Sequence, residues 1–282
     1  MAKDPTAAKL AALGNESTAD ELREALRDKS SHVMARAAKL IAARGWKELE
    51  PELAAAYGKL KKDPQCTAKL ALVAALSEFD TTRTEILFAA ARTVQWEDSW
   101  GRPVDAAAPL RGLAAMALAA NTTAPVDRVY RTLVDLLTDE QLTTRSHAAR
   151  ALGQLVHPQS ELLLRFKIQS GDAEPEVIGA CFDALLEVAP GEAVAYLEPY
   201  LERDAEDPLA FEAASALGAS RTPAAFELMI TKIAENHAMA DTLLRCLTPQ
   251  RFRVEWRERI ATAVKASGNE QLERTFAREY LE

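Results

Sequence analysis

A leucine that recurs along most of the chain is the feature that most constrains its fold. Successive copies are separated by steps of 36, 42, 34, 33, 32 and 30 residues. Periods in this range are typical of proteins built from stacked helical hairpins. In six of the seven copies a small residue precedes the leucine, which allows neighbouring helices to approach to roughly 8–10 Å. The recurring leucines are Leu40, Leu76, Leu118, Leu152, Leu185, Leu217 and Leu247.

An aspartate lies thirteen residues before the leucine in five successive units. We expect each unit to contain a first helix, A, and a second helix, B, which carries the leucine, with the aspartate in the turn between them. A short carboxylate there can accept hydrogen bonds from exposed backbone N–H groups at the start of helix B. In three units a cation follows six residues later, so ion pairs could connect neighbouring turns. This structural ladder comprises Asp63, Asp105, Asp139, Asp172, Asp204, Lys69, Arg111 and Arg145.

The fourth unit carries the pattern D-x5-[KR]-x-x-A-A-x-A-L-G, which resembles the HEAT-repeat consensus. The resemblance is to the short HEAT-like form, which is also found in phycobilin lyases. The resemblance covers roughly residues 20–250. It implies an all-α fold, a right-handed α-solenoid of about seven HEAT-like helical hairpins with a C-terminal capping helix pair. The matching residues are Asp139, Arg145, Ala148, Ala149, Ala151, Leu152 and Gly153.

We therefore expect a single HEAT-like repeat domain over residues 1–282, in which each hairpin contacts only its neighbours. Thr18 and Glu21 predict a capping box at the first A helix. A helix is predicted over residues 249–266, and residues 249–282 fit the repeat poorly, as a cap would. The predicted hairpins span residues 20–45, 46–80, 82–121, 125–157, 159–189, 192–219 and 223–247.

The third unit contains an insertion, QWEDSWGRPVDAAAP, after an A helix predicted over residues 83–94. Insertions in repeat proteins occur in loops at one edge, often the binding edge. Trp96 and Trp100 lie in this loop, and tryptophan is over-represented at binding hot spots. The alternative is that the loop folds back and the two indoles cover the edge of the third unit.

The resemblance implies that the B helices line a concave side. Positions five and two residues before the leucine, and two after it, share one stripe of helix B. This stripe is mostly alanine in the first two units, apolar in the third and charged in later ones. It predicts a site for an amphipathic or basic segment of a partner protein, unless close packing buries the alanines. The candidate partner-binding residues are Leu113, Met116, Trp96, Trp100, His147, Arg150, Asp183, Glu187 and Glu212.

The net charge of −8 lies almost entirely in the second half of the chain. Residues 1–141 carry 19 basic and 20 acidic side chains, whereas residues 142–282 carry 15 and 22. The acidic run 172–212 could attract a cationic partner, or it could be a solvated outer face. Phosphate contacts dominate nucleic-acid affinity, so a neutral to acidic groove argues against a nucleic-acid partner.

The four histidines and three cysteines have no metal-ligand spacing, so neither a metal nor a cofactor is expected. No nucleophile elbow or glycine-rich phosphate loop identifies a catalytic residue. The apolar run at the start is too short for a signal peptide, and no window approaches a membrane span, so we expect no membrane contact and a cytoplasmic protein.

The leading hypothesis is a non-catalytic protein–protein interaction scaffold. The resemblance implies two alternatives: a HEAT-like lyase or chaperone accessory protein that acts on a pigment-bearing partner, and a HEAT-like DNA glycosylase.

Overall fold

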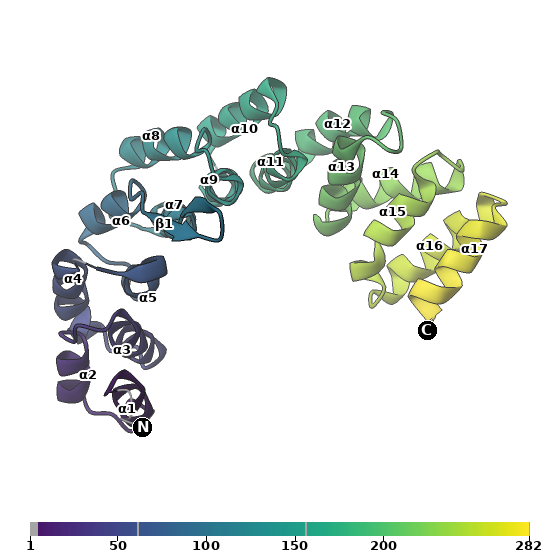
Figure 1. The fold of residues 1–282 in the computed structure, drawn as a ribbon. Helices are drawn as coiled ribbons and strands as arrows, with labels where there is room; N and C mark the ends of the chain where they lie inside the picture. Colours follow the sequence, from purple (N-terminus) through teal and green to yellow (C-terminus); the bar gives the residue numbers. More distant parts are fainter. Residues whose placement is uncertain (1–4, 61, 156, 282) are drawn as a thin grey trace. The chain divides into compact units, whose positions relative to one another are not determined.

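The computed structural model describes residues 5–60, 62–155 and 157–281, which are mostly helical (Figure 1). The strands within these residues are a short pair, β1 (Trp96–Ser99) and β2 (Arg102–Asp105). The prediction of a helical fold with packed neighbouring helices is confirmed, and the arrangement is consistent with an α-solenoid. The chain divides into two compact units, Met1–Ala151 and Leu152–Glu282.

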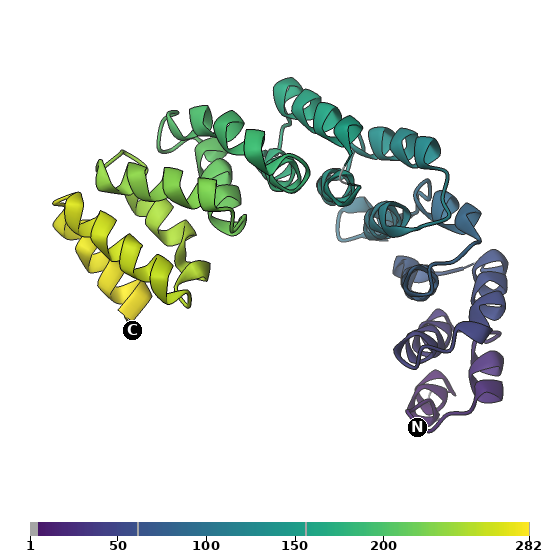
Figure 2. The same ribbon diagram turned by 180° about the vertical axis from the view of Figure 1, so that it is seen from behind.

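In the first unit, helices alternate along the chain between two layers (Figures 1 and 2). One layer contains α2, α4, α6 and α8, and the other contains α3, α5 and α7, with α3 packed on α5 and α5 on α7. Two 3-10 turns, Lys47–Leu49 and Pro64–Cys66, precede α4 and α5. The helices are α1 (Pro5–Ala12), α2 (Ala19–Ala25), α3 (Ser31–Ala43), α4 (Glu50–Lys59), α5 (Thr67–Glu78), α6 (Thr84–Ala90), α7 (Ala108–Ala120), α8 (Val126–Leu136) and α9 (Leu142–Gln154), which ends in the second unit.

In the second unit, α11 packs on α13, α13 on α15, and α15 on α17, while α14 packs on α16. A 3-10 turn, Thr248–Gln250, separates α15 from α16, and a π-helical turn, Ala277–Leu281, follows α17. The helices are α10 (Pro158–Ser170), α11 (Pro175–Val188), α12 (Pro190–Leu201), α13 (Pro208–Ala219), α14 (Pro223–Ala234), α15 (Ala240–Cys246), α16 (Val254–Ala266) and α17 (Glu270–Phe276).

Local chemistry explains where the helices begin. The predicted capping box is confirmed, because the Thr18 hydroxyl accepts from the Glu21 N–H and the Glu21 carboxylate accepts from the Thr18 N–H. Five consecutive helices, α10 to α14, each begin with proline. Proline suits the first helical position because its φ is already helical and its missing N–H would have had no partner there.

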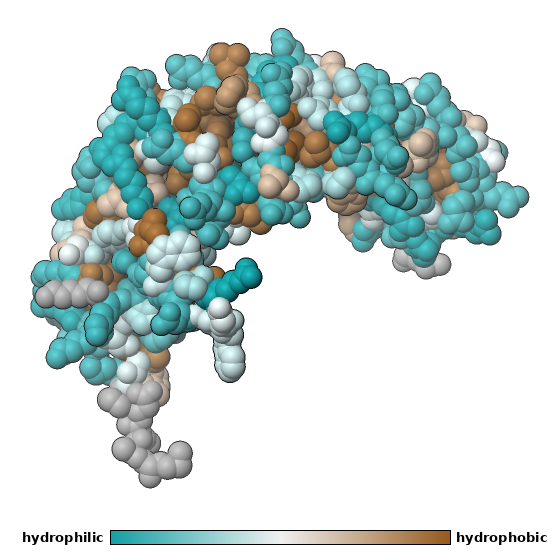
Figure 3. Space-filling model, turned by 45° about the horizontal axis from the view of Figure 1, so that its top comes forward, coloured by the Kyte–Doolittle hydropathy of each residue, from teal (hydrophilic) through white to brown (hydrophobic). Residues whose placement is uncertain are grey.

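The core consists mainly of leucine and alanine. All seven recurring leucines are buried, and so are the alanines that directly precede five of them. Small side chains at these positions let the B helices approach each other closely, as the spacing predicts. The visible surface is largely hydrophilic, with separate apolar areas (Figure 3). Exposed large apolar side chains include Leu162, Phe166, Phe211 and Phe252.

Two predicted helices are shorter in the structure. The helix predicted over 83–94 ends at Ala90, because the chain then enters the strand pair. The helix predicted over 249–266 begins at Val254. Before it, the buried Gln250 side chain donates to the carbonyl of Gly218 at 3.2 Å and holds a 3-10 turn against α13.

Candidate functional site

The insertion in the third unit is a β-hairpin rather than an irregular loop. Its strands pair antiparallel, from Trp96 opposite Asp105 to Ser99 opposite Arg102. Trp100 and Gly101 form the turn, and Gly101 has a φ of +88°, which glycine adopts without a steric penalty. We expected both tryptophans to lie in a loop at one edge. The structure places Trp96 on β1 and Trp100 in the turn between the two strands.

Trp100 lies at the tip of the hairpin with its side chain fully exposed. Trp96 is 56% exposed and Val104 is 52% exposed. The alternative in which both indoles fold back onto the third unit is therefore wrong for Trp100. Trp96 and Val104 lie on opposite faces of the hairpin, because their cross-strand partners are Asp105 and Glu97. The exposed apolar feature at the tip is therefore Trp100 itself.

Hydrogen bonds hold the base of the hairpin against the α4–α5 turn. The Gln95 amide donates to the carbonyl of Asp63 at 2.7 Å and to Glu97 at 2.6 Å. Glu97 also accepts from the backbone N–H of Gln65 at 2.7 Å, and Gln65 has a φ of +56°. The tip is thus exposed while the base is anchored. Sequence reasoning did not identify Gln95 or Glu97, because their partners lie about thirty residues earlier in the chain.

The ladder is continuous over residues 63–139. Asp63 accepts from the N–H groups of Ala68 and Lys69, in the first turn of α5. Gln95 links the Asp63 carbonyl to the Asp105 carboxylate, to which its own N–H donates at 3.0 Å. Arg111 then bridges Asp105 at 2.6 Å and Asp139 at 2.7 Å. The predicted connection between neighbouring turns is confirmed for Arg111.

The Asp105–Arg111 pair is almost completely buried. Burial alone raises the pKa of Asp105, but hydrogen bonds from Gln95, Arg111 and Ala107 outweigh it, and the pKa is lowered. Burial alone lowers the pKa of Arg111, but the two aspartates outweigh it, and the pKa is raised. Both groups therefore stay charged. Their role is structural, since each is engaged by the other and by backbone groups.

The remaining contacts of the ladder residues hold the turns in place without an arginine that joins two aspartates. Lys69 donates to the Gln95 side chain at 2.9 Å rather than to an aspartate. Arg145 donates to the backbone carbonyls of Asp139 and Glu140. Asp139, Asp172 and Asp204 each accept from the N–H two residues later, the local turn that aspartate favours.

The stripe on the B helices is partly packed. Ala35, Ala38 and Ala71 are buried, so close packing is the correct interpretation for these alanines. Leu113 and Met116 on α7 are half-buried, and Arg150 on α9 is exposed. These three remain accessible to a partner of the first unit.

His147 and Glu212 lie over glycines of the preceding B helix. A Cβ at Gly112 would lie 3.0 Å from the His147 ring, and a Cβ at Gly179 would lie 2.0 Å from a Glu212 carboxylate oxygen. Both side chains thus fill space that a glycine leaves. Packing between neighbouring helices therefore accounts for the positions of both side chains, without a partner protein. This packing against glycines could have been predicted from the sequence, because a glycine lies six residues before both Leu118 and Leu185.

The acidic stripe of the second unit comprises exposed Asp183 and Glu187 together with half-buried Glu212. Burial, followed by the charges of Glu176 and Asp183, raises the pKa of Glu212. Glu187 lies near Gly153, where a Cβ would be 3.2 Å from its carboxylate. These residues form an acidic surface on α11 and α13.

Within the described residues, no group of three or more His, Cys, Asp or Glu side chains is placed to hold a metal ion. Burial raises the pKa of the Cys181 thiol to about 12 and that of the Cys246 thiol to about 11. A thiol with so high a pKa is protonated at neutral pH and is a weak nucleophile. In the described part of the chain, no helix is long and apolar enough to span a bilayer.

No protein-family model and no curated protein matches this chain. Among solved structures, the crystal structure of an engineered protein from the Northeast Structural Genomics Consortium is 17% identical to it. That match covers 91% of this chain and 96% of the engineered chain, with a TM-score of 0.33. A likeness of this size carries no argument about repeat type or function.

Proposed function

We propose that this chain is a right-handed HEAT-like α-solenoid of about seven hairpins with a C-terminal cap, and that it acts as a non-catalytic protein–protein interaction scaffold in the cytoplasm. The paired helices, the buried leucine of each pair and the aspartates in the A–B turns support the repeat type. A scaffold requires an accessible surface on a rigid support, and it requires no reactive group.

The observation that carries the proposal is the exposed tip of the β1–β2 hairpin on an anchored base. A fully exposed tryptophan in water costs free energy that a partner's apolar pocket would recover. Because Gln95 and Glu97 hold the hairpin to the α4–α5 turn, little conformational entropy is lost when Trp100 is bound. Leu113 and Met116 on α7 provide a second, half-buried apolar contact for an amphipathic segment.

The proposal is tested by affinity capture from lysate of the source cell, with quantitative mass spectrometry of the bound proteins. Trp100→Ser should reduce recovery of the specific partner by at least about tenfold, since tryptophan hot spots contribute about 2 kcal/mol or more and a factor of ten is about 1.4 kcal/mol. Phe166→Ser is the matched control, because Phe166 is also exposed but lies on α10. Leu113→Ser tests the stripe separately.

Equal recovery with wild type and Trp100→Ser would remove the hairpin from the proposal. Equal losses with Trp100→Ser and Phe166→Ser would indicate non-specific adhesion through exposed aromatic side chains, and the scaffold proposal would fail. Circular dichroism of each variant establishes that the helices remain intact.

A further inference from the structure

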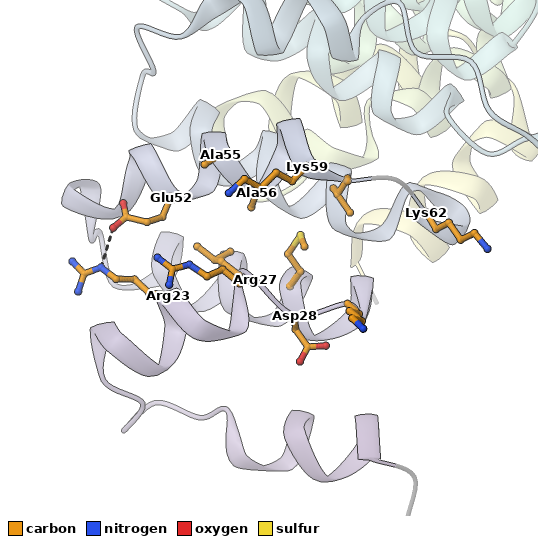
Figure 4. Close-up of a pocket in the computed structure, with 12 residues that line it drawn as sticks. Arg23, Arg27, Asp28, Glu52, Ala55, Ala56, Lys59 and Lys62 are labelled. Carbon is orange, nitrogen blue, oxygen red and sulfur yellow. Dashed lines mark hydrogen bonds and ion pairs between the residues drawn. The ribbon is translucent and has the colours of Figure 1, made fainter.

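A pocket of about 710 Å³ lies between α2, α4 and the start of α3, in the first unit (Figure 4). Its floor is apolar, since Leu26, Met34 and Ala56 line it and are buried. The half-buried Leu60 and the exposed Ala55 continue the apolar lining. Its described lining residues all lie between Arg23 and Lys62 in the sequence, and they include neither the hairpin tip nor the B-helix stripe.

The rim of the pocket is basic, although the chain as a whole is acidic. Five cations and two carboxylates line it, and both carboxylates already have partners. Glu52 pairs with Arg23 at 2.9 Å, and Asp28 pairs with Lys9 at 2.5 Å. The remaining four cations are exposed and make no ion pair or side-chain hydrogen bond with any described residue. They are Arg27, Lys29, Lys59 and Lys62.

These cations are spread along the pocket and do not converge on one point. Arg27 extends from the end of α2 into the space between α2 and α4, and Lys59 lies on α4 across that space (Figure 4). Lys62 points away from both (Figure 4). Arg27 occupies the register position that holds the ladder aspartate in the five later units. A distributed positive charge fits an extended anion with several separate negative groups.

The backbone around the pocket favours a peptide over a phosphate. The C-caps of α2 and α4, Leu26 and Leu60, both line the pocket. Helix C-termini expose carbonyl oxygens and carry partial negative charge, whereas phosphate sites typically use N–H groups at helix N-termini. At the nearby start of α3, the Ser30 N–H already donates to Asp28 at 2.8 Å. Two of the three helix ends near the pocket are therefore C-termini, whose partial negative charge does not favour a compact phosphate.

The side chains that line the pocket argue against a single-stranded nucleic acid as its ligand. Single-stranded nucleic acids bind through basic grooves interleaved with aromatic side chains. Among the described residues that line the pocket, none is aromatic. The apolar floor instead matches an aliphatic side chain, and the flanking cations match carboxylates on either side of it.

We propose that this pocket binds an acidic segment of a partner protein, in which carboxylates flank one or more leucine-like side chains. The site is a second docking surface, distinct from the hairpin and the B-helix stripe. It selects a negatively charged segment, whereas the acidic stripe of the second unit would select a positively charged one. Arg27 and Lys59 bind carboxylates, and Leu26, Met34 and Ala56 receive the apolar side chain.

The test uses the full chain and a fluorescein-labelled peptide of sequence DELEDL, measured by fluorescence anisotropy. Binding should weaken as salt is added, because the contacting charges are exposed. Arg27→Glu/Lys59→Glu should weaken binding by about tenfold or more, since like charges across an interface repel. Lys39→Glu/Lys47→Glu is the matched control, because it changes the net charge equally at exposed lysines outside the pocket, and it should have less than about a twofold effect.

A companion peptide, DESEDS, isolates the apolar floor. It should bind about fivefold or more weakly than DELEDL, as expected for the loss of buried aliphatic side chains. Equal affinity for the two peptides would mean that the floor is unused, and the proposal would be wrong. Equal weakening by the pocket variant and the control variant would also overturn it.

Competition distinguishes other anions. Displacement of the labelled peptide by inorganic phosphate or by single-stranded RNA at lower concentration than by unlabelled DELEDL would assign the pocket to those ligands and overturn the proposal. Concentration-dependent self-association in analytical ultracentrifugation that Arg27→Glu/Lys59→Glu abolishes would assign it to a second copy of this chain, with the same consequence.

Two further variants keep the result interpretable. Arg27→Gln/Lys59→Gln removes the charges without introducing repulsion, and it should also weaken binding of DELEDL. This variant replaces the charge-reversed protein in the test if the charge-reversed protein is poorly folded. Trp100→Ser should leave DELEDL binding unchanged. Failure of the hairpin in the capture experiment and failure of the pocket in the anisotropy experiment are therefore distinguishable.

Discussion

Arg111 shows how much of this fold depends on one buried charge. Its guanidinium is 4% exposed and bonds to two carboxylates and to the Thr93 carbonyl. Removing one partner of a buried pair leaves an uncompensated charge, which costs more than the pair itself contributes. Asp105, with a side chain that is 3% exposed, would be left in that position.

We expect Arg111→Met to lower the free energy of unfolding by about 3–5 kcal/mol at neutral pH. Urea denaturation followed by circular dichroism measures the change. Adding Asp105→Asn to this variant should recover part of the loss, because the orphaned charge is removed. A double variant less stable than the single one would contradict this account.

The same site predicts a pH dependence. The pKa of Asp105 is lowered in the folded protein, so its contribution is complete above the ordinary aspartate pKa of about 3.9 and is lost as the pH falls through the lower folded value. The stability difference between wild type and Arg111→Met should therefore be largest near neutral pH and should shrink below about pH 4. A difference that is independent of pH would show that packing, not charge, accounts for it.

Glu212 predicts the opposite dependence. Burial and the charges of Glu176 and Asp183 raise its pKa, so the ionised carboxylate lowers the stability of the fold. That penalty is absent at acidic pH and develops as the pH rises above the ordinary glutamate pKa of about 4.3. Glu212→Gln should raise the urea midpoint at pH 7 and have little effect near pH 3.5. A lower midpoint at pH 7 would mean that the charge has a stabilising partner.

At the scale of elements, glycines determine how closely the B helices pack. A Cβ at Gly218 on α13 would lie 2.4 Å from the backbone carbonyl oxygen of Cys246 on α15. A Cβ at Gly179 on α11 would meet the end of the Glu212 side chain instead. Backbone cannot move aside without shifting a helix, whereas a flexible carboxylate can rotate away.

We therefore expect Gly218→Ala to destabilise the protein by about 1–3 kcal/mol, through overpacking between α13 and α15. Gly179→Ala, the matched control, should be close to neutral, because the gain in helix propensity of up to about 1 kcal/mol offsets the displacement of Glu212. Chemical denaturation of both variants provides the comparison. Equal effects would indicate that α15 shifts easily.

Local sequence patterns predicted the helices but did not predict the hairpin. Helix bounds followed from leucine spacing, capping residues and proline positions, all of which act within one or two turns. The hairpin did not follow in the same way. Trp96 to Asp105 contains no alternating apolar pattern, and the strands are held by Gln95, Glu97 and the α4–α5 turn.

At the scale of the whole molecule, the chain has two compact units that each contain their own buried leucines. Trp46, Trp96 and Trp100 belong to the first unit, and Trp256 belongs to the second, where it stacks on Phe226 with 4.0 Å between ring centroids. Stability in repeat proteins is a sum of local and nearest-neighbour terms, so unfolding need not be a single step.

This arrangement makes unfolding testable unit by unit. In a chain that retains only Trp256, Gly218→Ala should lower the urea midpoint of the fluorescence change. In a chain that retains only Trp46, the same substitution should shift the midpoint less. Equal shifts would show that the two units unfold together.

The sequence alone determined the helical register, the buried leucines and the aspartates in the turns, because these depend on periodicity and on bonds between residues close in the chain. Only the tertiary structure decided that Arg111 joins two turns, that His147 and Glu212 pack against glycines of the neighbouring helix, and that residues of α2, α3 and α4 line a basic pocket. Those contacts join residues on different helices, often about thirty positions apart. They depend on the angle and distance at which helices stack, which no local pattern encodes.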